Sequence, residues 1–129
     1  MNNAFLDIKN KGWEDMSQLM RLLGQPVRLQ ILLAIGDGEA CVCHLEAALG
    51  ERQAYISQQL MALREAALVT THRIGRNIYY RLKDHDLLNL IELAAKFSGI
   101  NSMKIASISP IEGCPCPHCH IDFLIRESK

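Results

Sequence analysis

The five cysteines of this 129-residue chain lie in two clusters that are far apart in the sequence. The first is Cys41-Val42-Cys43, and the second is the run 114–120, which reads Cys-Pro-Cys-Pro-His-Cys-His. An odd number of cysteines in two clusters is not the pattern of a disulfide framework, whereas thiolates are good ligands for soft metal ions. The pattern therefore predicts a metal site with the ligands Cys41, Cys43, Cys114, Cys116 and Cys119, and with His118 and His120 as secondary donors.

The pair Cys41 and Cys43 is expected at the start of a helix. Within a regular helix two such side chains would point about 200° apart. The residue that precedes the first turn is extended, however, so both sulfurs can face the same ion. The positive end of the helix and a bound metal both favour the thiolate form. Alternatively, the two cysteines are small buried apolar residues.

Two sulfurs do not complete a site for As(III), Cd(II), Pb(II) or Zn(II), which take about three or four ligands. The segment between Phe97 and Cys114 can extend over some tens of ångströms, so we expect the tail to supply the missing donors. Two alternatives remain open. The tail binds metal without any regulatory use, or a tail cysteine forms a covalent bond with Cys41 or Cys43 under oxidant or persulfide.

The charges of the chain balance, but one basic stretch stands out. Lys plus Arg number 14 and Asp plus Glu number 14, whereas the segment 64–83 holds five basic residues against the single acidic residue Glu65. A localised basic surface on a neutral protein is typical of anion binding, and nucleic acid is the first candidate. With 49% hydrophobic and 22% charged residues, the composition is that of one globular domain and excludes a disordered chain.

Hydrophobic periodicity predicts a mainly α-helical domain with one small β-hairpin. A first helix ends near Leu23, before Gly24, and an almost entirely apolar second helix follows Pro26. Two short helices separated by a Gly-Glu-Arg turn come next, and an alternating segment with a Gly-Arg-Asn tip follows them. The expected elements are helices over 13–23, 27–35, 42–49 and 53–66, strands over 69–74 and 78–82, and a last helix that Asp84 caps and that runs to Phe97.

The two short helices and the basic hairpin behind them form the pattern of a winged helix-turn-helix. The second of these helices has an apolar stripe made of Ile56, Leu60, Leu63 and Ala67. Its polar N-terminal end is then free to read base edges in the major groove, and the arginines of the hairpin suit phosphates. Alternatively, this polar face is only solvated. The expected contacts with double-stranded DNA are Gln53, Ala54, Tyr55, Ser57, Gln58, Arg64, Arg73, Arg76 and Arg81.

In the second strand of the hairpin, alternation places successive side chains on opposite faces. We expect Ile78, Tyr80 and Leu82 on one face, and Tyr79 and Arg81 on the other. We interpret this hairpin as a wing.

The domain boundaries follow from where the periodicity stops. We expect a flexible arm over 1–12, a winged helix-turn-helix and dimerisation domain over 13–98, and a Cys/His-rich tail over 99–129. The last helix is more apolar than one packing stripe requires, so α-helical dimerisation elements are expected at both ends of the domain, forming a homodimer. No signal peptide and no run long enough to span a membrane are visible, and thiols outside disulfides fit a cytoplasmic protein.

The sequence does not suggest an enzyme. It has no Gly-rich cofactor loop, no Cys-x-x-Cys at a strand-to-helix turn and no triad-like grouping. We therefore expect no organic cofactor, and a soft metal or metalloid ion as the ligand.

Four segments, 25–32, 40–45, 55–60 and 75–82, resemble the ArsR/SmtB family of metal-responsive winged-helix transcriptional repressors in their order and spacing. The resemblance covers about half of the chain. It implies a homodimer that binds a palindromic operator and releases it when a metal or metalloid inducer binds. It also implies that the first cysteine pair is a metal-ligand box, although Glu46 stands where arsenic sensors of the family often have a third cysteine.

A further metal site of that family, on the last helix, has lost most of its ligands in this chain. Asp84 matches the first of the four family ligands, but Asp86, Phe97 and Ile100 stand at the other three positions. We therefore expect no zinc site there and interpret Asp84 as a helix cap.

Overall fold

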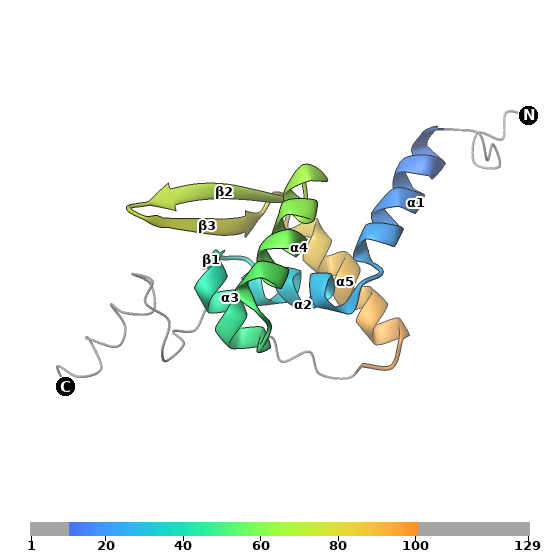
Figure 1. Cartoon of the computed structure of the whole chain (residues 1–129). Helices are drawn as coiled ribbons and strands as arrows, with labels where there is room; N and C mark the ends of the chain where they lie inside the picture. The colour runs from blue at the N-terminus through green and yellow to red at the C-terminus, as the bar shows by residue number, and fades with distance from the viewer. Residues whose placement is uncertain (1–10, 101–129) are drawn as a thin grey trace, which may run out of the picture.

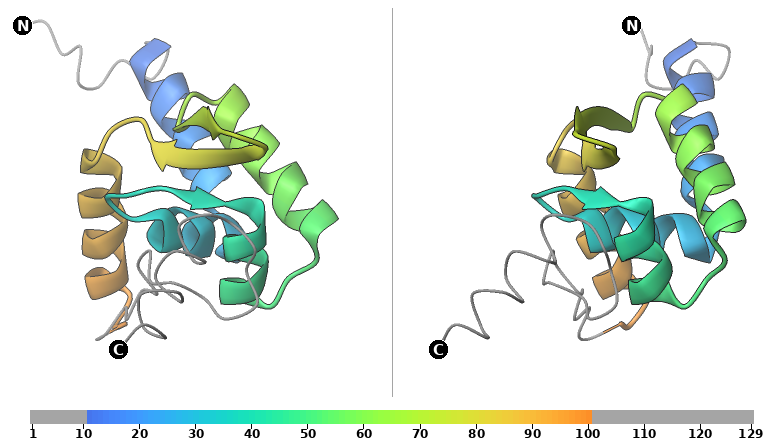
Figure 2. Two further views of the ribbon diagram at one scale, coloured as in Figure 1. Left: turned by 90° about the vertical axis from the view of Figure 1, so that its left-hand side faces the viewer. Right: turned by 60° about the vertical axis from the view of Figure 1, so that its left-hand side comes forward.

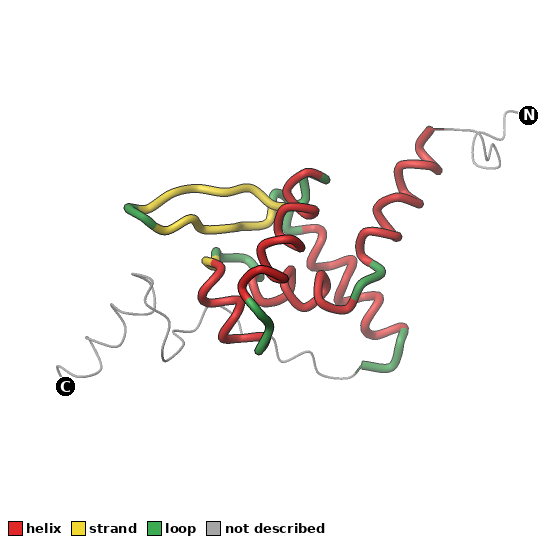
Figure 3. Tube along the Cα trace, viewed as in Figure 1, coloured by secondary structure: helices red, strands yellow, loops and turns green. Residues whose placement is uncertain are grey.

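The computed structural model describes residues 11–100. The expected tail ligands, in the run 114–120, lie outside the described residues. A hairpin extends from one side of a helical body and the first helix extends from the other (Figure 1; Figure 3). In chain order the elements are α1 Lys11–Leu23, α2 Pro26–Ile35, β1 Ala40–Cys41, α3 Val42–Leu49, α4 Gln53–Glu65, β2 Val69–Ile74, β3 Asn77–Leu82 and α5 Asp86–Phe97.

The expected helices and hairpin are confirmed, with small shifts at their ends. Helix α1 includes Lys11 and Gly12 ahead of the expected first residue Trp13. A glycine near a helix end costs only about 1 kcal/mol of conformational entropy. The carboxylate of Asp84 accepts a hydrogen bond of 2.9 Å from the backbone N–H of Asp86. Asp84 thus caps α5 as expected, and the helix itself begins at Asp86.

The sheet contains a strand that the sequence did not predict. Strand β1 pairs antiparallel with β3, and β3 pairs antiparallel with β2, in the order β1-β3-β2. Figure 2 shows β1 running alongside the hairpin. A strand of two residues is too short to give a periodic signal, so only the fold reveals it.

The turn of the hairpin is one residue shorter than expected. Ile74 pairs with Asn77, which leaves Gly75 and Arg76 as the two turn residues. The φ angle of Gly75 is +62°, a conformation that glycine adopts without steric cost. Arg76 therefore lies at the outermost point of the wing.

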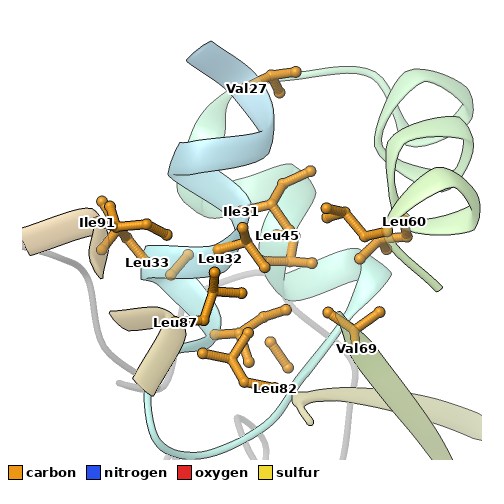
Figure 4. Packing of buried hydrophobic residues seen from close by; sticks show 14 of the residues in the cluster. Val27, Ile31, Leu32, Leu33, Leu45, Leu60, Val69, Leu82, Leu87 and Ile91 are labelled. Carbon is orange, nitrogen blue, oxygen red and sulfur yellow. The ribbon is translucent and has the colours of Figure 1, made fainter. Parts of the chain in front are cut away.

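The core forms where α2 lies between α3, α4, α5 and the base of the sheet (Figure 4). Ile31, Leu32, Leu45 and Leu60 are fully buried, and each such side chain stabilises the fold by about 1.5–3 kcal/mol. Because α2 is covered on several sides, it is apolar almost all round.

The apolar stripe of α4 ends earlier than expected. Leu63 is fully buried, but Ala67 lies beyond the helix end, is exposed and has a φ angle of +61°. The N–H of Leu68 bonds to the carbonyl of Leu63 across this turn, which is the closing pattern of many helices. The assignment of Ala67 to the stripe was wrong, because the chain has already left the helix there.

A polar link ties α4 to the other helices. Nε of Arg28 donates to Oε1 of Gln59 at 2.8 Å, and a guanidinium nitrogen of Arg28 donates to the carbonyl of Leu22 at 3.1 Å. Gln59 is buried, so its amide needs such a partner. Arg28 thereby connects α2 to α4 and to the end of α1.

Candidate nucleic-acid interface and cysteine pair

The N-terminal half of α4 presents a polar face outward. Ile56 is fully buried, and Ser57 is partly exposed. Gly50, with a φ angle of +66°, ends α3 and lets the chain turn into α4. The residues exposed at this end of α4 are Gln53, Ala54, Tyr55 and Gln58, as predicted.

The predicted arginines of the wing lie near its tip and near its base. Arg73 and Arg76 are exposed near its tip. Arg81 lies nearer the base, where its side chain is 54% exposed and its Nη2 is 2.7 Å from Oε2 of Glu39. A guanidinium has five N–H donors, so one ion pair leaves others able to meet a phosphate.

The far end of α4 holds one expected residue and one that sequence reasoning missed. Arg64 is about 16 Å along the helix from Gln53, and just over three full turns bring it back to nearly the same side. Met61 is 62% exposed, about one turn beyond Gln58. An apolar residue in a helical pattern is normally assigned to the core, and Met61 is recognisable only by its position off the stripe.

The cysteine pair lies at the start of α3, as predicted. Cys41 precedes the first turn with extended backbone angles of φ −90° and ψ 168°, and Cys43 follows within the helix. Cys41 is buried, and Cys43 is a partly exposed free thiol. This is the extended backbone that the sequence predicted before the first turn of the helix.

The pair fits a soft ion in its donor chemistry, but two thiols supply only part of a ligand set. Within residues 11–100, no group of three or more Cys, His, Asp or Glu side chains could hold a metal ion. The predicted tail donors, Cys114, Cys116, Cys119, His118 and His120, lie outside the described residues.

The fold places the cysteine pair beside the wing, which the sequence did not indicate. Cys41 pairs with Tyr79 of β3, and Tyr79 pairs with His72 of β2. Directly paired residues share a face of a sheet, so these three residues form a row. The expected face of Tyr79, opposite Leu82, agrees with this register. Tyr79 is nevertheless fully buried, and its ring centre lies 5.7 Å from that of His72.

Glu39, directly before β1, contacts both strands of the hairpin. Its Oε2 lies 2.7 Å from Nη2 of Arg81 and 3.0 Å from Nδ1 of His72. The side chain of Glu39 is only 15% exposed. Sequence reasoning missed Glu39, because its partner Arg81 is 42 positions away and no local pattern links the two.

An apolar surface lies on the helices at the two ends of the domain. A pocket of about 440 Å³ opens among α1, α2 and α5. Met20 lines this pocket. On other faces of the same helices, Phe97 is 95% exposed and Leu93 is 67% exposed on α5, and Met16 is exposed on α1. This agrees with the excess apolar surface that the sequence indicated on the last helix.

The described part of the chain contains no helix long and apolar enough to cross a membrane.

Comparison with known proteins gives consistent matches. The family model for bacterial regulatory proteins of the arsR family matches residues 25–71. The transcriptional repressor SmtB homolog of Synechocystis sp. is 39% identical over 77 residues, which make up 60% of this chain and 58% of that protein. The cadmium resistance transcriptional regulatory protein CadC of Listeria innocua is 30% identical over 98 residues, which make up 75% of this chain and 82% of that protein.

A solved structure shows the same fold. The winged helix-turn-helix DNA-binding domain Mb0332 of Mycobacterium bovis, which is described as homodimeric, is 28% identical with a TM-score of 0.63. The match covers 77% of this chain and 91% of that domain. These three proteins are described as regulators, and none of them as an enzyme. The matched segment, the order of the elements and these relatives together show that the chain belongs to the ArsR family of bacterial regulatory proteins.

Proposed function

We propose that this chain is a DNA-binding transcriptional repressor that acts as a homodimer and releases its operator when a soft metal or metalloid ion binds cysteine ligands. The observation that carries the proposal is the combination, in one domain, of a polar exposed end of α4 with a basic wing. The repressor and resistance-regulator names of the relatives support the same reading.

In this proposal α4 enters the major groove. Gln53 and Gln58 are exposed at its N-terminal end, and a glutamine can form paired hydrogen bonds with adenine. Arg73 and Arg76 at the tip of the wing then meet phosphates or the adjacent minor groove. Two copies related by a two-fold axis would read a palindrome whose half-sites lie about 34 Å apart.

The second copy is expected on the apolar surface of α1 and α5. Phe97 and Leu93 are exposed on α5, and Met16 and Met20 are exposed on α1. Such apolar surface is costly in water. The homodimeric description of the Mycobacterium bovis domain supports this assembly. The spacing of the two α4 helices would then depend on how the two subunits pack.

The proposed inducer ligands are the thiolates of Cys41 and Cys43 together with Cys114, Cys116 and Cys119. When bound, a soft ion would supply strong bonds to sulfur that favour one arrangement of the dimer. Release requires that the ion prefer the arrangement with lower DNA affinity, and moving a two-state equilibrium from 1:99 to 99:1 takes about 5.5 kcal/mol of differential binding. The cadmium-resistance name of CadC supports a metal inducer for this chain.

The test is a DNA-release titration with the full-length protein. Fluorescence anisotropy follows a labelled duplex, selected from a random pool by the protein itself, as As(III), Cd(II), Pb(II) or Zn(II) is added. We expect release by at least one of these ions, and loss of the response in the double variant Cys41→Ser/Cys43→Ser. Retention of the full response by that variant would refute the role of the pair.

A second variant separates the joined site from simpler arrangements. Replacing Cys114, Cys116 and Cys119 with serine should weaken release if the tail completes the site, and should leave it unchanged if the pair acts without the tail. Release by an oxidant or a persulfide in the absence of metal, reversed by a reducing agent, would instead favour covalent control of the same repressor.

A further inference from the structure

The proposed repressor binds DNA with its wing and senses its inducer at the cysteine pair, and Glu39 lies between the two. We propose that Glu39 is a positioning residue that couples the cysteine pair to the wing. It does so by accepting the hydrogen bond of Arg81 at 2.7 Å, with Nδ1 of His72 lying 3.0 Å from the same oxygen. This inference rests on the proposed DNA binding, and it requires no bound metal.

The contacts of Glu39 join three strands. Its carboxylate reaches β2 at His72 and β3 at Arg81, while its own backbone leads directly into β1. A two-stranded hairpin alone is marginally stable, so its angle to the helical body depends on what holds it. Val69 and Leu82 anchor the base of the hairpin in the core, and Glu39 together with β1 holds its side.

Cys41 is part of strand β1, which directly follows Glu39. It pairs with Tyr79 as part of β1, and it is also the residue that precedes the first turn of α3. Glu39 comes two positions before Cys41, directly ahead of β1. Its carboxylate accepts the hydrogen bond of Arg81, which lies on the same face of β3 as Tyr79, the partner of Cys41. A change at the sulfur of Cys41 that shifts this backbone therefore also shifts the carboxylate that holds Arg81.

Arg81 makes the link relevant to DNA. Its side chain is half exposed, and only one of its nitrogens is 2.7 Å from Glu39. The remaining donors can meet a phosphate only where the carboxylate holds them. Coupling between two sites is reciprocal, so DNA bound at the wing must alter the surroundings of Cys41 and Cys43.

The test measures that reciprocal effect without metal. Full-length protein in the presence of a chelator is treated with iodoacetamide, with and without a saturating duplex selected from a random pool by the wild-type protein. Mass spectrometry of peptides gives the alkylation rates of Cys41 and Cys43. The ratio of the rates with and without DNA is compared among wild type, Glu39→Ala, Glu39→Gln and the control Asp37→Ala. Asp37 is an exposed carboxylate in the same loop.

We expect bound DNA to change the alkylation rates to the same extent in wild type and in Asp37→Ala, so that the ratio differs from one in both. In Glu39→Ala the ratio should fall to about one. Glu39→Gln should be intermediate, because its amide oxygen still accepts a hydrogen bond from Arg81. Thermal unfolding followed by circular dichroism checks that each variant is folded. If Glu39→Ala does not fold, the alkylation ratio of Glu39→Gln tests the coupling instead.

Several results would overturn the inference. A ratio in the folded Glu39 variants equal to that of wild type would show that DNA acts on the thiols by direct shielding. A ratio of one in wild type would show that no coupling exists. If no duplex can be selected, the proposed function fails and this inference fails with it, whereas the other two outcomes leave DNA binding intact.

Discussion

Replacing Arg76 with glutamine measures how much the tip of the wing contributes to DNA binding. Arg76 lies in the two-residue turn between Gly75 and Asn77 and is exposed. Its loss should therefore leave the core unchanged. If Arg76 meets one phosphate, it displaces about one counterion, and the slope of log affinity against log salt should become shallower by about 0.9.

The structure distinguishes Arg76 from Arg81. The charge of Arg81 is already balanced by Glu39 at 2.7 Å, so Arg81→Gln should flatten the slope by clearly less than about 0.9. Between about 50 and about 200 mM salt, a difference of 0.9 in slope changes the affinity ratio of wild type to Arg76→Gln by about 3.5-fold.

The assay is fluorescence anisotropy of a selected duplex at several salt concentrations. Arg21→Gln is the matched control, because Arg21 is an exposed arginine on α1 whose guanidinium donates to Ser17 at 3.2 Å, away from the wing. We expect the control to keep the wild-type slope. An Arg76 variant with the wild-type slope, or an equal loss in the Arg21 control, would refute the assignment of the tip of the wing to phosphate contact.

Three more predictions follow from the same structure. Arg28→Met leaves the buried amide of Gln59 without its 2.8 Å partner. It should lower the free energy of unfolding, measured by urea denaturation, by about 1–3 kcal/mol. The control Arg21→Met should change this free energy little. Phe97→Asp places a charge on a 95% exposed apolar site; it should shift sedimentation toward the monomer without lowering the stability of the domain, and an unchanged dimer would exclude α5 from the interface. Met61→Gln should reduce discrimination for thymine at one operator position by about 0.8 kcal/mol, the value of one buried methyl-sized group, in a selection experiment. An unchanged base preference would remove Met61 from the interface.

The helices and the hairpin could be predicted from the sequence because their signals are local. The apolar spacing in α4, the proline before α2 and the glycine of the hairpin turn each act within a few residues. The position of the cysteine pair at the start of α3 followed from the same local reasoning, and the structure confirms it. The exposed polar end of α4 was also predictable, because it lies opposite a stripe of fully buried residues.

Strand β1, the burial of Tyr79 and the contacts of Glu39 could not be predicted in this way. They depend on pairs that lie far apart in the chain, such as Glu39 with Arg81, which are 42 positions apart, and Arg28 with Gln59, which are 31 positions apart. No repeat or turn residue encodes such pairs, since they form only when packing brings two elements together. The sequence thus specified a winged helix-turn-helix with a cysteine pair at a helix start. Packing of β1 against β3 placed that pair beside the wing, because strand pairing joins backbones regardless of their separation in the chain.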